Sequence, residues 1–352
     1  MLKQLILLLG TLCLFTACEV EKPQPTILAD NLNGTLRIQY TGSGDIVTCR
    51  LFDRVATMEK IEEAHFQLSV QVENLDSSVF GFYINSYKLN NDNKSELIES
   101  YTHKWRGSIL PKFLESDQLT GAYQTDSLFD PLTKAYRSYS MYLPDLELSK
   151  VDTLNVVIMI DGEALPRYYK YVDQLIQKKN IHPVALFGLH STQGKSEGHS
   201  IRYLEYVKTD NASPYFLNHE AFFIEAFLPF IENTLDQYGS YLDLSLYGYS
   251  NGGAFCTYLG LNYPDKFEHI VAFSTAGYIS EFYNRRNYTY LDYPYFYLGA
   301  GKYESSILGD NQFFCNELEA NKLSYEFHEF NSGHDYIAWR YEFLTFLTKS
   351  FN

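Results

Sequence analysis

The chain has 352 residues, which is enough for two domains, and it carries a net charge of −15 with a pI near 5.0. An acidic surface repels polyanions, so the composition argues against nucleic acid as a partner. The aromatic content is high, with 31 Tyr and 25 Phe, and we attribute most of it to tyrosine-rich strands and packing.

The N-terminus is typical of an export signal. A charged start at Lys3 is followed by an apolar stretch over Leu5–Phe15, too short to span a bilayer, so we interpret residues 1–17 as a signal peptide. The residues up to Cys18 resemble a bacterial lipobox, in which the cysteine is lipidated; an ordinary signal peptide cut nearby is the alternative. Residues 18–26 then form a polar tether. The sequence predicts an exported bacterial lipoprotein, membrane-anchored on the periplasmic side or at the cell surface.

Three further cysteines, Cys49, Cys256 and Cys315, lack the spacing of a disulfide framework or a zinc site. We expect them to be small buried residues, although one pair could form a disulfide.

An N-terminal β domain is predicted over residues 27–135. Short alternating apolar runs separated by turn residues favour a small antiparallel sandwich, with strands over Thr35–Tyr40, Phe66–Val72 and Val79–Ile84. The stretch Trp105–Pro131 contains chain breakers and is predicted to be an irregular seam between domains.

The pattern changes over residues 136–352, where strands and helices alternate. A nearly continuous apolar run at Leu154–Ile160 is typical of a parallel strand buried on both faces. This alternation predicts a doubly wound α/β sheet. An edge strand is expected at Ser140–Pro144, further strands at Val184–Leu189, His269–Ser274, Tyr295–Gly299 and Ser324–Phe330, and helices at Arg167–Lys179 and Glu220–Tyr238.

A nucleophile elbow is predicted at Gly248-Tyr249-Ser250-Asn251-Gly252, because an apolar strand-like segment enters this Gly-x-Ser-x-Gly sequence and a helix-like segment leaves it. The flanking glycines suit a tight, crowded turn. We interpret Ser250 as the nucleophile.

The general base is predicted to be His334. A serine hydroxyl needs a base and a group that orients the base, and in hydrolases with this elbow the order along the chain is Ser, acid, His. His334 lies in a loop between the last predicted strand and the last helix, whereas His269 and His328 fall in strands.

The acid is expected in the loop after the predicted strand Tyr295–Gly299. Glu304 fits that loop best, and Asp310, nearer the next helix, is the alternative. Asp292 precedes the strand, and Asp335 is better placed to cap the last helix.

Two backbone amides are predicted to stabilise the oxyanion of the tetrahedral intermediate. One is that of Asn251, after the nucleophile. The other is that of Glu163, in the loop leaving the strand Leu154–Ile160, where Gly162 allows close approach to the substrate. Asp161 has no second ligand at metal-binding spacing, and we interpret it as a turn residue.

From about Tyr139 to its end, the chain resembles the α/β-hydrolase esterase family that includes S-formylglutathione hydrolase, enterochelin esterase, feruloyl esterases and mycolyltransferases. The resemblance implies a Ser250–His334 pair with an acid in the Glu304 loop, where Asp is more usual; some enterochelin-type members use a Ser–His dyad. It also places Arg202 and Glu205 near the mouth of the active site, as substrate-binding residues or as a local salt bridge. The matching segments are Met159–Glu163, Arg202–Tyr206, Glu225–Ile231, the elbow and Gly333–Trp339.

These observations together predict an exported serine esterase that forms an acyl-enzyme and needs no metal or organic cofactor. The resemblance implies acyl or feruloyl groups on polysaccharides, or siderophore-type esters, as substrates. A non-catalytic lipoprotein that binds a glycan or siderophore, and an acyltransferase, are the alternatives.

Overall fold

The computed structural model describes residues 25–145, 154–196, 198–209, 212–236, 241–277 and 293–352. The predicted signal peptide over 1–17, the lipid-attachment residue Cys18 and most of the tether lie outside these residues. Within them, no helix is both long and apolar enough to cross a membrane.

The N-terminal part consists of two four-stranded antiparallel sheets, in the orders β1-β2-β6-β5 and β4-β3-β7-β8. Alternate residues of both sheets, such as Ile38, Val47 and Phe82, point into one shared core. The predicted small all-β domain is thereby confirmed. Its strands are β1 (Thr26–Asp30), β2 (Thr35–Thr41), β3 (Ile46–Leu51), β4 (Arg54–Thr57), β5 (Glu59–Glu62), β6 (His65–Gln71), β7 (Val79–Leu89) and β8 (Ser95–Arg106), with a short helix η1 (Leu75–Ser77) before β7.

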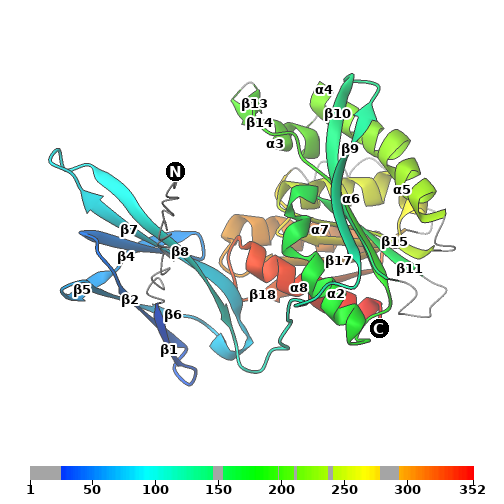
Figure 1. Ribbon diagram of the computed structural model, residues 1–352. Coiled ribbons are helices and arrows are strands. Elements are labelled where there is room, and N and C mark those ends of the chain that lie inside the picture. The colour runs from blue at the N-terminus through cyan, green and yellow to red at the C-terminus, as the bar shows by residue number, and fades with distance from the viewer. Residues whose placement is uncertain (1–24, 146–153, 197, 210–211, 237–240, 278–292) are drawn as a thin grey trace, which may run out of the picture.

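The second part is built on an eight-stranded sheet in the order β18-β17-β16-β15-β11-β12-β10-β9. Figure 1 shows this part on the right and the N-terminal sheets on the left. Six strands run parallel, β10 runs antiparallel to them, and β9 pairs antiparallel with β10 at the edge of the sheet. The strands are β9 (Ala122–Asp130), β10 (Ala135–Leu143), β11 (Leu154–Ile160), β12 (Val184–Leu189), β15 (Tyr241–Tyr249), β16 (His269–Phe273), β17 (Tyr295–Gly301) and β18 (Tyr325–Phe330); a two-stranded ribbon, β13 (Lys195–Ser196) and β14 (His199–Ser200), lies outside the sheet.

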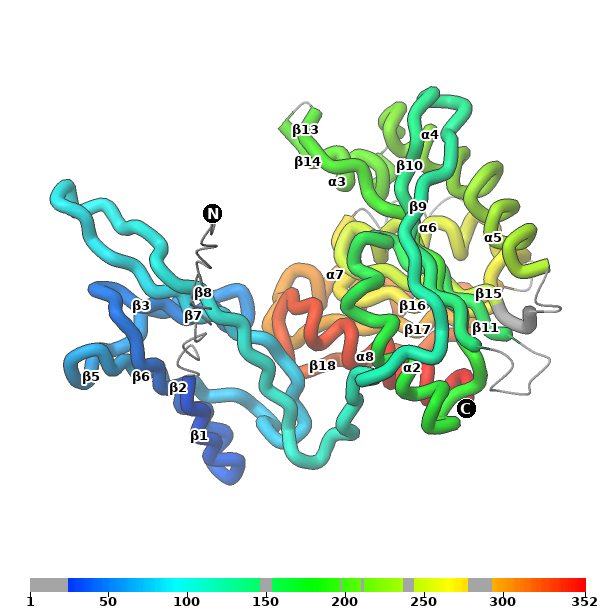
Figure 2. Tube along the Cα trace, in the orientation of Figure 1, coloured from blue at the N-terminus to red at the C-terminus, as the bar shows by residue number. Residues whose placement is uncertain are grey.

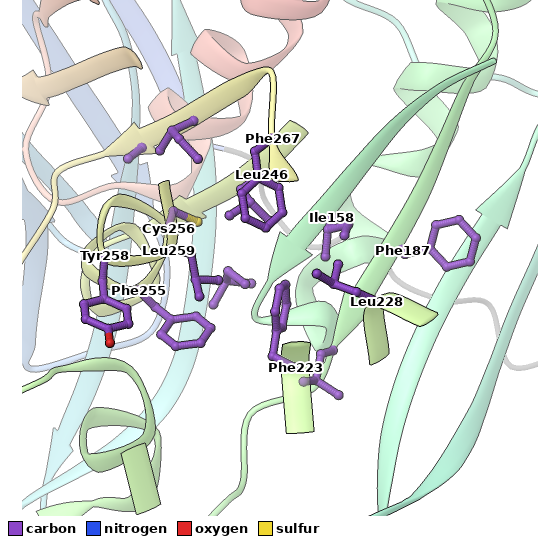
Figure 3. Packing of buried hydrophobic residues seen from close by; sticks show 14 of the residues in the cluster. Ile158, Phe187, Phe223, Leu228, Leu246, Phe255, Cys256, Tyr258, Leu259 and Phe267 are labelled. Atoms are coloured by element: carbon purple, nitrogen blue, oxygen red, sulfur yellow. The ribbon is translucent and has the colours of Figure 1, made fainter. Parts of the chain in front are cut away.

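Helices cover both faces of this sheet, as predicted for a doubly wound fold. Successive residues of β11 belong to different cores: Ile158 packs with one helical layer and Val157 with the other. Figure 3 shows the first core, in which Phe223, Leu228 and Phe255 of the helices meet the sheet. The helices are η2 (Gly162–Arg167), α2 (Tyr169–Gln177), α3 (Ile201–Tyr206), α4 (Pro214–Phe222), a π-helical segment η3 (Phe223–Phe227), α5 (Leu228–Leu235), α6 (Asn251–Asn262), η5 (Pro264–Lys266), α7 (Ser305–Ala320) and α8 (Tyr336–Ser350).

Two expectations need correction. The strand predicted at Ser140–Pro144 is not at the edge, because β10 pairs with β9 on one side and β12 on the other. The seam predicted to be irregular over Trp105–Pro131 contains β9, which lies inside the range assigned to the N-terminal domain but pairs into the α/β sheet. The chain between β8 and β9 crosses from one part to the other (Figure 2).

Cys49, Cys256 and Cys315 are buried and unpaired, and burial raises the pKa of each thiol. These cysteines therefore pack as small apolar residues, as expected.

Candidate active site

Ser250 occupies a strained turn between β15 and α6, with φ 55° and ψ −128°. Few residues with a side chain adopt positive φ, and such strain is maintained only where neighbouring contacts enforce it. Here the N–H of Ser250 donates to the carbonyl of Phe273 at 2.9 Å, and its carbonyl accepts from the N–H of Ala276 at 3.0 Å. The end of β16 and the residues after it thus hold the serine at the carboxyl end of the sheet.

Close packing at this turn requires glycine at Gly248 and leaves little room for a side chain at Gly252. A Cβ at Gly248 would lie 2.5 Å from the carbonyl oxygen of Gly252, and one at Gly252 would lie 3.0 Å from Oδ2 of Asp161. The Gly-x-Ser-x-Gly pattern therefore has a steric cause here.

The structure brings Ser250, His334 and Glu304 together. Oγ of Ser250 lies 3.0 Å from Nε2 of His334, and Nδ1 of the same ring lies 2.5 Å from Oε1 of Glu304. An ionised carboxylate only accepts hydrogen bonds, so Glu304 favours the tautomer with its proton on Nδ1. Nε2 is then free to accept the serine proton.

Glu304 is held rigidly by groups that sequence reasoning missed. Its side chain is 1% exposed, and Oε2 accepts from the N–H of Gly301 at 2.7 Å and from Oγ of Ser274 at 2.6 Å. Ser274 in turn accepts from Nε1 of Trp339 at 2.7 Å, and the indole meets the His334 ring edge to face at 4.6 Å. This network fixes the positions of the Glu304 carboxylate and the His334 ring together.

Asp310, the alternative acid, lies exposed on α7, six residues beyond Glu304. Asp335 caps α8 through the N–H of Ile337 at 2.9 Å, as the sequence predicted. Among the three carboxylates, Glu304 is the one in contact with His334.

The two predicted oxyanion donors both lie in first turns of helices. Glu163 is the second residue of η2, and Asn251 is the first residue of α6. Amides in the first turn of a helix have no acceptor within the helix and point outward. Gly162 packs against β12: a Cβ there would lie 2.1 Å from the carbonyl of Gly188, so only glycine fits.

Arg202 links the elbow to the loop after β11 that carries Asp161, Gly162 and Glu163. This loop is called the oxyanion loop below. Its Nε lies 2.5 Å from Oδ1 of Asp161, one terminal nitrogen lies 2.6 Å from Oδ2, and the other donates to Oδ1 of Asn251 at 3.1 Å. Burial raises the pKa of Asp161, and the guanidinium opposes that shift. Asp161, with φ 66°, is thus a turn residue as predicted, and it also anchors Arg202.

Glu205 is a buried carboxylate on α3. Its side chain is 5% exposed; it accepts from Arg137 at 2.8 Å and from the N–H and Oγ1 of Thr192 at 2.9 and 2.6 Å. The structure therefore joins Glu205 to Arg137 and Thr192 rather than to the Ser250–His334–Glu304 cluster.

A pocket of about 750 Å³ opens beside Glu163. Its charged lining consists of three carboxylates and one guanidinium, and the carboxylate of Glu163 is fixed by the N–H and Oγ of Ser191 at 3.1 and 2.5 Å. The pocket therefore adjoins the oxyanion loop. Its lining residues are Asp130, Thr133, Ala135, Tyr136, Arg137, Ser138, Glu163, His190, Ser191, Thr192, Gln193, Glu205, Tyr215 and Asn218.

No group of three or more His, Cys, Asp or Glu side chains placed to hold a metal ion occurs in the described part of the chain.

Residues 133–290 match the family described as "Putative esterase", a range that includes the elbow and the oxyanion loop. A comparison with curated protein sequences returns no match. The resemblance drawn from the sequence is confirmed, because this part of the chain matches an esterase family.

Solved structures show the same fold. Ferric enterobactin esterase from Salmonella typhimurium is 12% identical with a TM-score of 0.69, covering 92% of this chain and 95% of that one. A siderophore hydrolase from Aspergillus nidulans is 15% identical with a TM-score of 0.52, covering 69% and 98%. A ferulic acid esterase is 16% identical with a TM-score of 0.51, covering 66% and 98%. The α/β-hydrolase fold with a preceding β domain is thereby confirmed.

Proposed function

We propose that this protein is a serine esterase that hydrolyses carboxylic esters through an acyl-enzyme. The observation that carries the proposal is the chain of contacts from Oγ of Ser250 through the His334 ring to Glu304, at 3.0 and 2.5 Å. A nucleophile, a base and an orienting acid in this order are what acyl transfer needs. The match of residues 133–290 to an esterase family supports the same conclusion.

The acylation step follows from these positions. Nε2 of His334 takes the Oγ proton as Oγ bonds to the ester carbon, and the carbonyl electron pair moves onto oxygen. The amides of Glu163 and Asn251 stabilise that oxyanion. When the intermediate collapses, the bond to the alcohol oxygen breaks, His334 protonates the departing alcohol, and the acyl group stays on Ser250.

Deacylation repeats the sequence with water. His334 takes a proton from water as the oxygen attacks the acyl carbon, and then returns it to Oγ, releasing the acid. An alcohol in place of water would make the protein an acyltransferase.

The pocket beside Glu163 is the proposed site for one of the two groups joined by the ester. Its volume, about 750 Å³, is within the range of small-molecule sites. The similar structures include esterases of enterobactin and of ferulic acid, so we propose acyl or feruloyl groups on saccharides, or siderophore-type esters, as substrates.

We further propose that the enzyme is exported and anchored through a lipid on Cys18. The support is the order of charged, apolar and small residues before this cysteine. Cys18→Ala should move the protein from the membrane fraction to the soluble fraction; equal membrane retention would contradict the anchor.

The experiment is release of acid from p-nitrophenyl butyrate, methyl ferulate, acetylated xylan and a catecholate trilactone, with the wild type beside Ser250→Ala. Turnover that the mutant loses supports a serine esterase, and the preferred ester identifies the substrate class. A folded wild type that turns over none of them would favour a binding lipoprotein, or a transferase lacking its acceptor.

A further inference from the structure

A tight turn of the N-terminal β domain contacts the loop that carries the proposed base. Phe52 and Asp53 connect β3 to β4, where Leu51 pairs with Arg54, and both turn residues have positive φ, 50° and 62°. Two such residues between paired strands form the hairpin turn that suits the twist of antiparallel strands. The backbone of this turn therefore has the conformation of a two-residue hairpin turn.

Asp53 bonds directly to the backbone of His334. Its Oδ2 accepts the His334 N–H at 2.9 Å, and its Oδ1 accepts from Arg50 at 3.0 Å. Gly333 packs against the same turn: a Cβ there would lie 2.8 Å from Cα of Phe52. The position of the His334 backbone is thus set by a residue more than 280 positions earlier in the chain.

The same turn also touches the loop that carries Glu304. The Phe52 ring stacks on Tyr303, the residue before Glu304, with centroids 4.1 Å apart and planes inclined by 20°. The hydroxyl of Tyr303 accepts the N–H of Glu73, from the loop after β6, at 3.3 Å. The β domain therefore contacts both the loop that carries Glu304 and the loop that carries His334.

A third contact fixes the start of α8, directly after His334. The carboxylate of Asp335 accepts the N–H of Gly81 on β7 while it caps α8. A Cβ at Gly81 would lie 2.6 Å from Cδ1 of Ile337, so β7 and the start of α8 approach each other closely here. His334 is thus flanked by contacts to the β domain on both sides in the sequence.

From this geometry we infer that the Phe52–Asp53 turn is a positioning element for catalysis and that Asp53 is a positioning residue for His334. The inference rests on the proposed function, in which His334 is the base. The hydrogen bond holds the backbone from which the imidazole reaches Ser250. A base displaced by about 1 Å loses on the order of a hundredfold in rate, because proton transfer depends steeply on geometry.

The test compares two substitutions that the turn tolerates. Asp53→Gly keeps the positive φ and removes the acceptor; Asp53→Asn suits the same φ and keeps an acceptor oxygen. We expect Asp53→Gly to lower kcat about tenfold to a hundredfold with KM within about twofold of the wild type, and Asp53→Asn to restore kcat to within about threefold. Arg50→Gln, which leaves the Asp53 acceptor in place, should stay close to the wild type.

Thermal unfolding of each variant, with Ser250→Ala beside it, separates the outcomes. Equal turnover by the wild type and Ser250→Ala would overturn the proposed function and this inference together. If Ser250→Ala is inactive, the inference alone fails in either of two cases: Asp53→Gly keeps the wild-type kcat, or Asp53→Asn is as slow as Asp53→Gly. A lowered kcat in Asp53→Gly with an unchanged melting temperature and rescue by Asn would support positioning rather than a general loss of structure.

Discussion

Three residues with side chains at the proposed site have a positive φ: Asp161 at 66°, Ser250 at 55° and Ser274 at 46°. They follow the neighbouring strands β11, β15 and β16, at the edge where the carboxyl ends of parallel strands meet. Each conformation costs about 1–3 kcal/mol and persists only where the surroundings impose it. Three strained residues therefore lie together at the carboxyl end of the sheet, where the reaction is proposed to occur.

Glu304→Gln tests the orienting acid. Loss of the negative charge removes the preference for a proton on Nδ1 of His334, so we expect kcat to fall about a thousandfold. Steady-state kinetics measures the effect, with Asp310→Asn as the control, since Asp310 is an exposed carboxylate on α7. A small effect of Glu304→Gln would indicate a Ser–His dyad instead.

At the residue scale, the sequence predicted the serine, the histidine and the glutamate because each lies in a local pattern or at a fixed place in chain order. Ser274 and Trp339 had no such signal: they reach Glu304 and His334 only through contacts formed by folding. Asp53 is more distant still. A local sequence pattern does not indicate which turn of another domain will contact the segment.

At the scale of elements, buried strands were the easiest to predict. All seven residues of β11 are buried, and its apolar run is continuous. By contrast, most residues of β9 are exposed, and its sequence has no apolar alternation because it lies at the edge of the sheet. The missing periodicity explains why the sequence indicated an irregular seam there and placed β10 at the edge.

Strand β18 is tied to α8 and β17 through Glu326. Its carboxylate accepts from Lys349, from Nε2 of His328 at 2.6 Å and from the hydroxyl of Tyr295 at 3.1 Å. Burial raises the pKa of Glu326, but these donors outweigh it and lower the pKa to about 2. A hydrogen bond to Glu342 contributes most to raising the pKa of His328, so this ring is charged in acid.

A lowered folded-state pKa makes Glu326 stabilising above the unfolded value, roughly 4.3, and this stabilisation is lost as pH falls from there towards 2. We therefore expect the urea midpoint of the wild type to drop more steeply between pH 4.5 and 3 than that of Glu326→Gln. Glu96→Gln, on the exposed end of β8, is the matched control. Parallel pH profiles for the wild type and Glu326→Gln would contradict the assignment.

At the scale of the whole molecule, electrostatics should influence which esters are accepted. The chain has a net charge of −15, and the pocket beside Glu163 is lined by Asp130, Glu163, Glu205 and Arg137. Arg137 is paired with Glu205 at 2.8 Å, so the remaining carboxylates give the pocket wall a net negative charge. Both features disfavour an anionic substrate group in this pocket.

We expect kcat/KM for methyl 4-carboxycinnamate to be about tenfold lower than for its near-isosteric neutral carbamoyl analogue at low salt. The ratio should narrow as added salt screens the charges. Measuring both esters from 10 mM to 500 mM NaCl checks this. Equal kcat/KM at every salt concentration would show that the pocket charge does not act on the substrate.

The relative placement of the two parts is the feature that the sequence reveals least. Turn residues and alternating runs predict a β domain, but they do not say that its β3–β4 turn meets the loop of His334. That contact depends on the shape of two finished folds. Through this contact, the N-terminal domain is proposed to contribute to catalysis.

The central claim is that Ser250, activated by His334, is the nucleophile. The most direct test is labelling by a fluorophosphonate, which reacts with activated serines, followed by peptide mass spectrometry of the wild type and His334→Ala. We expect one equivalent of label on the peptide containing Ser250, formed much more slowly in His334→Ala. An unlabelled Ser250 in a preparation that still hydrolyses esters would contradict it.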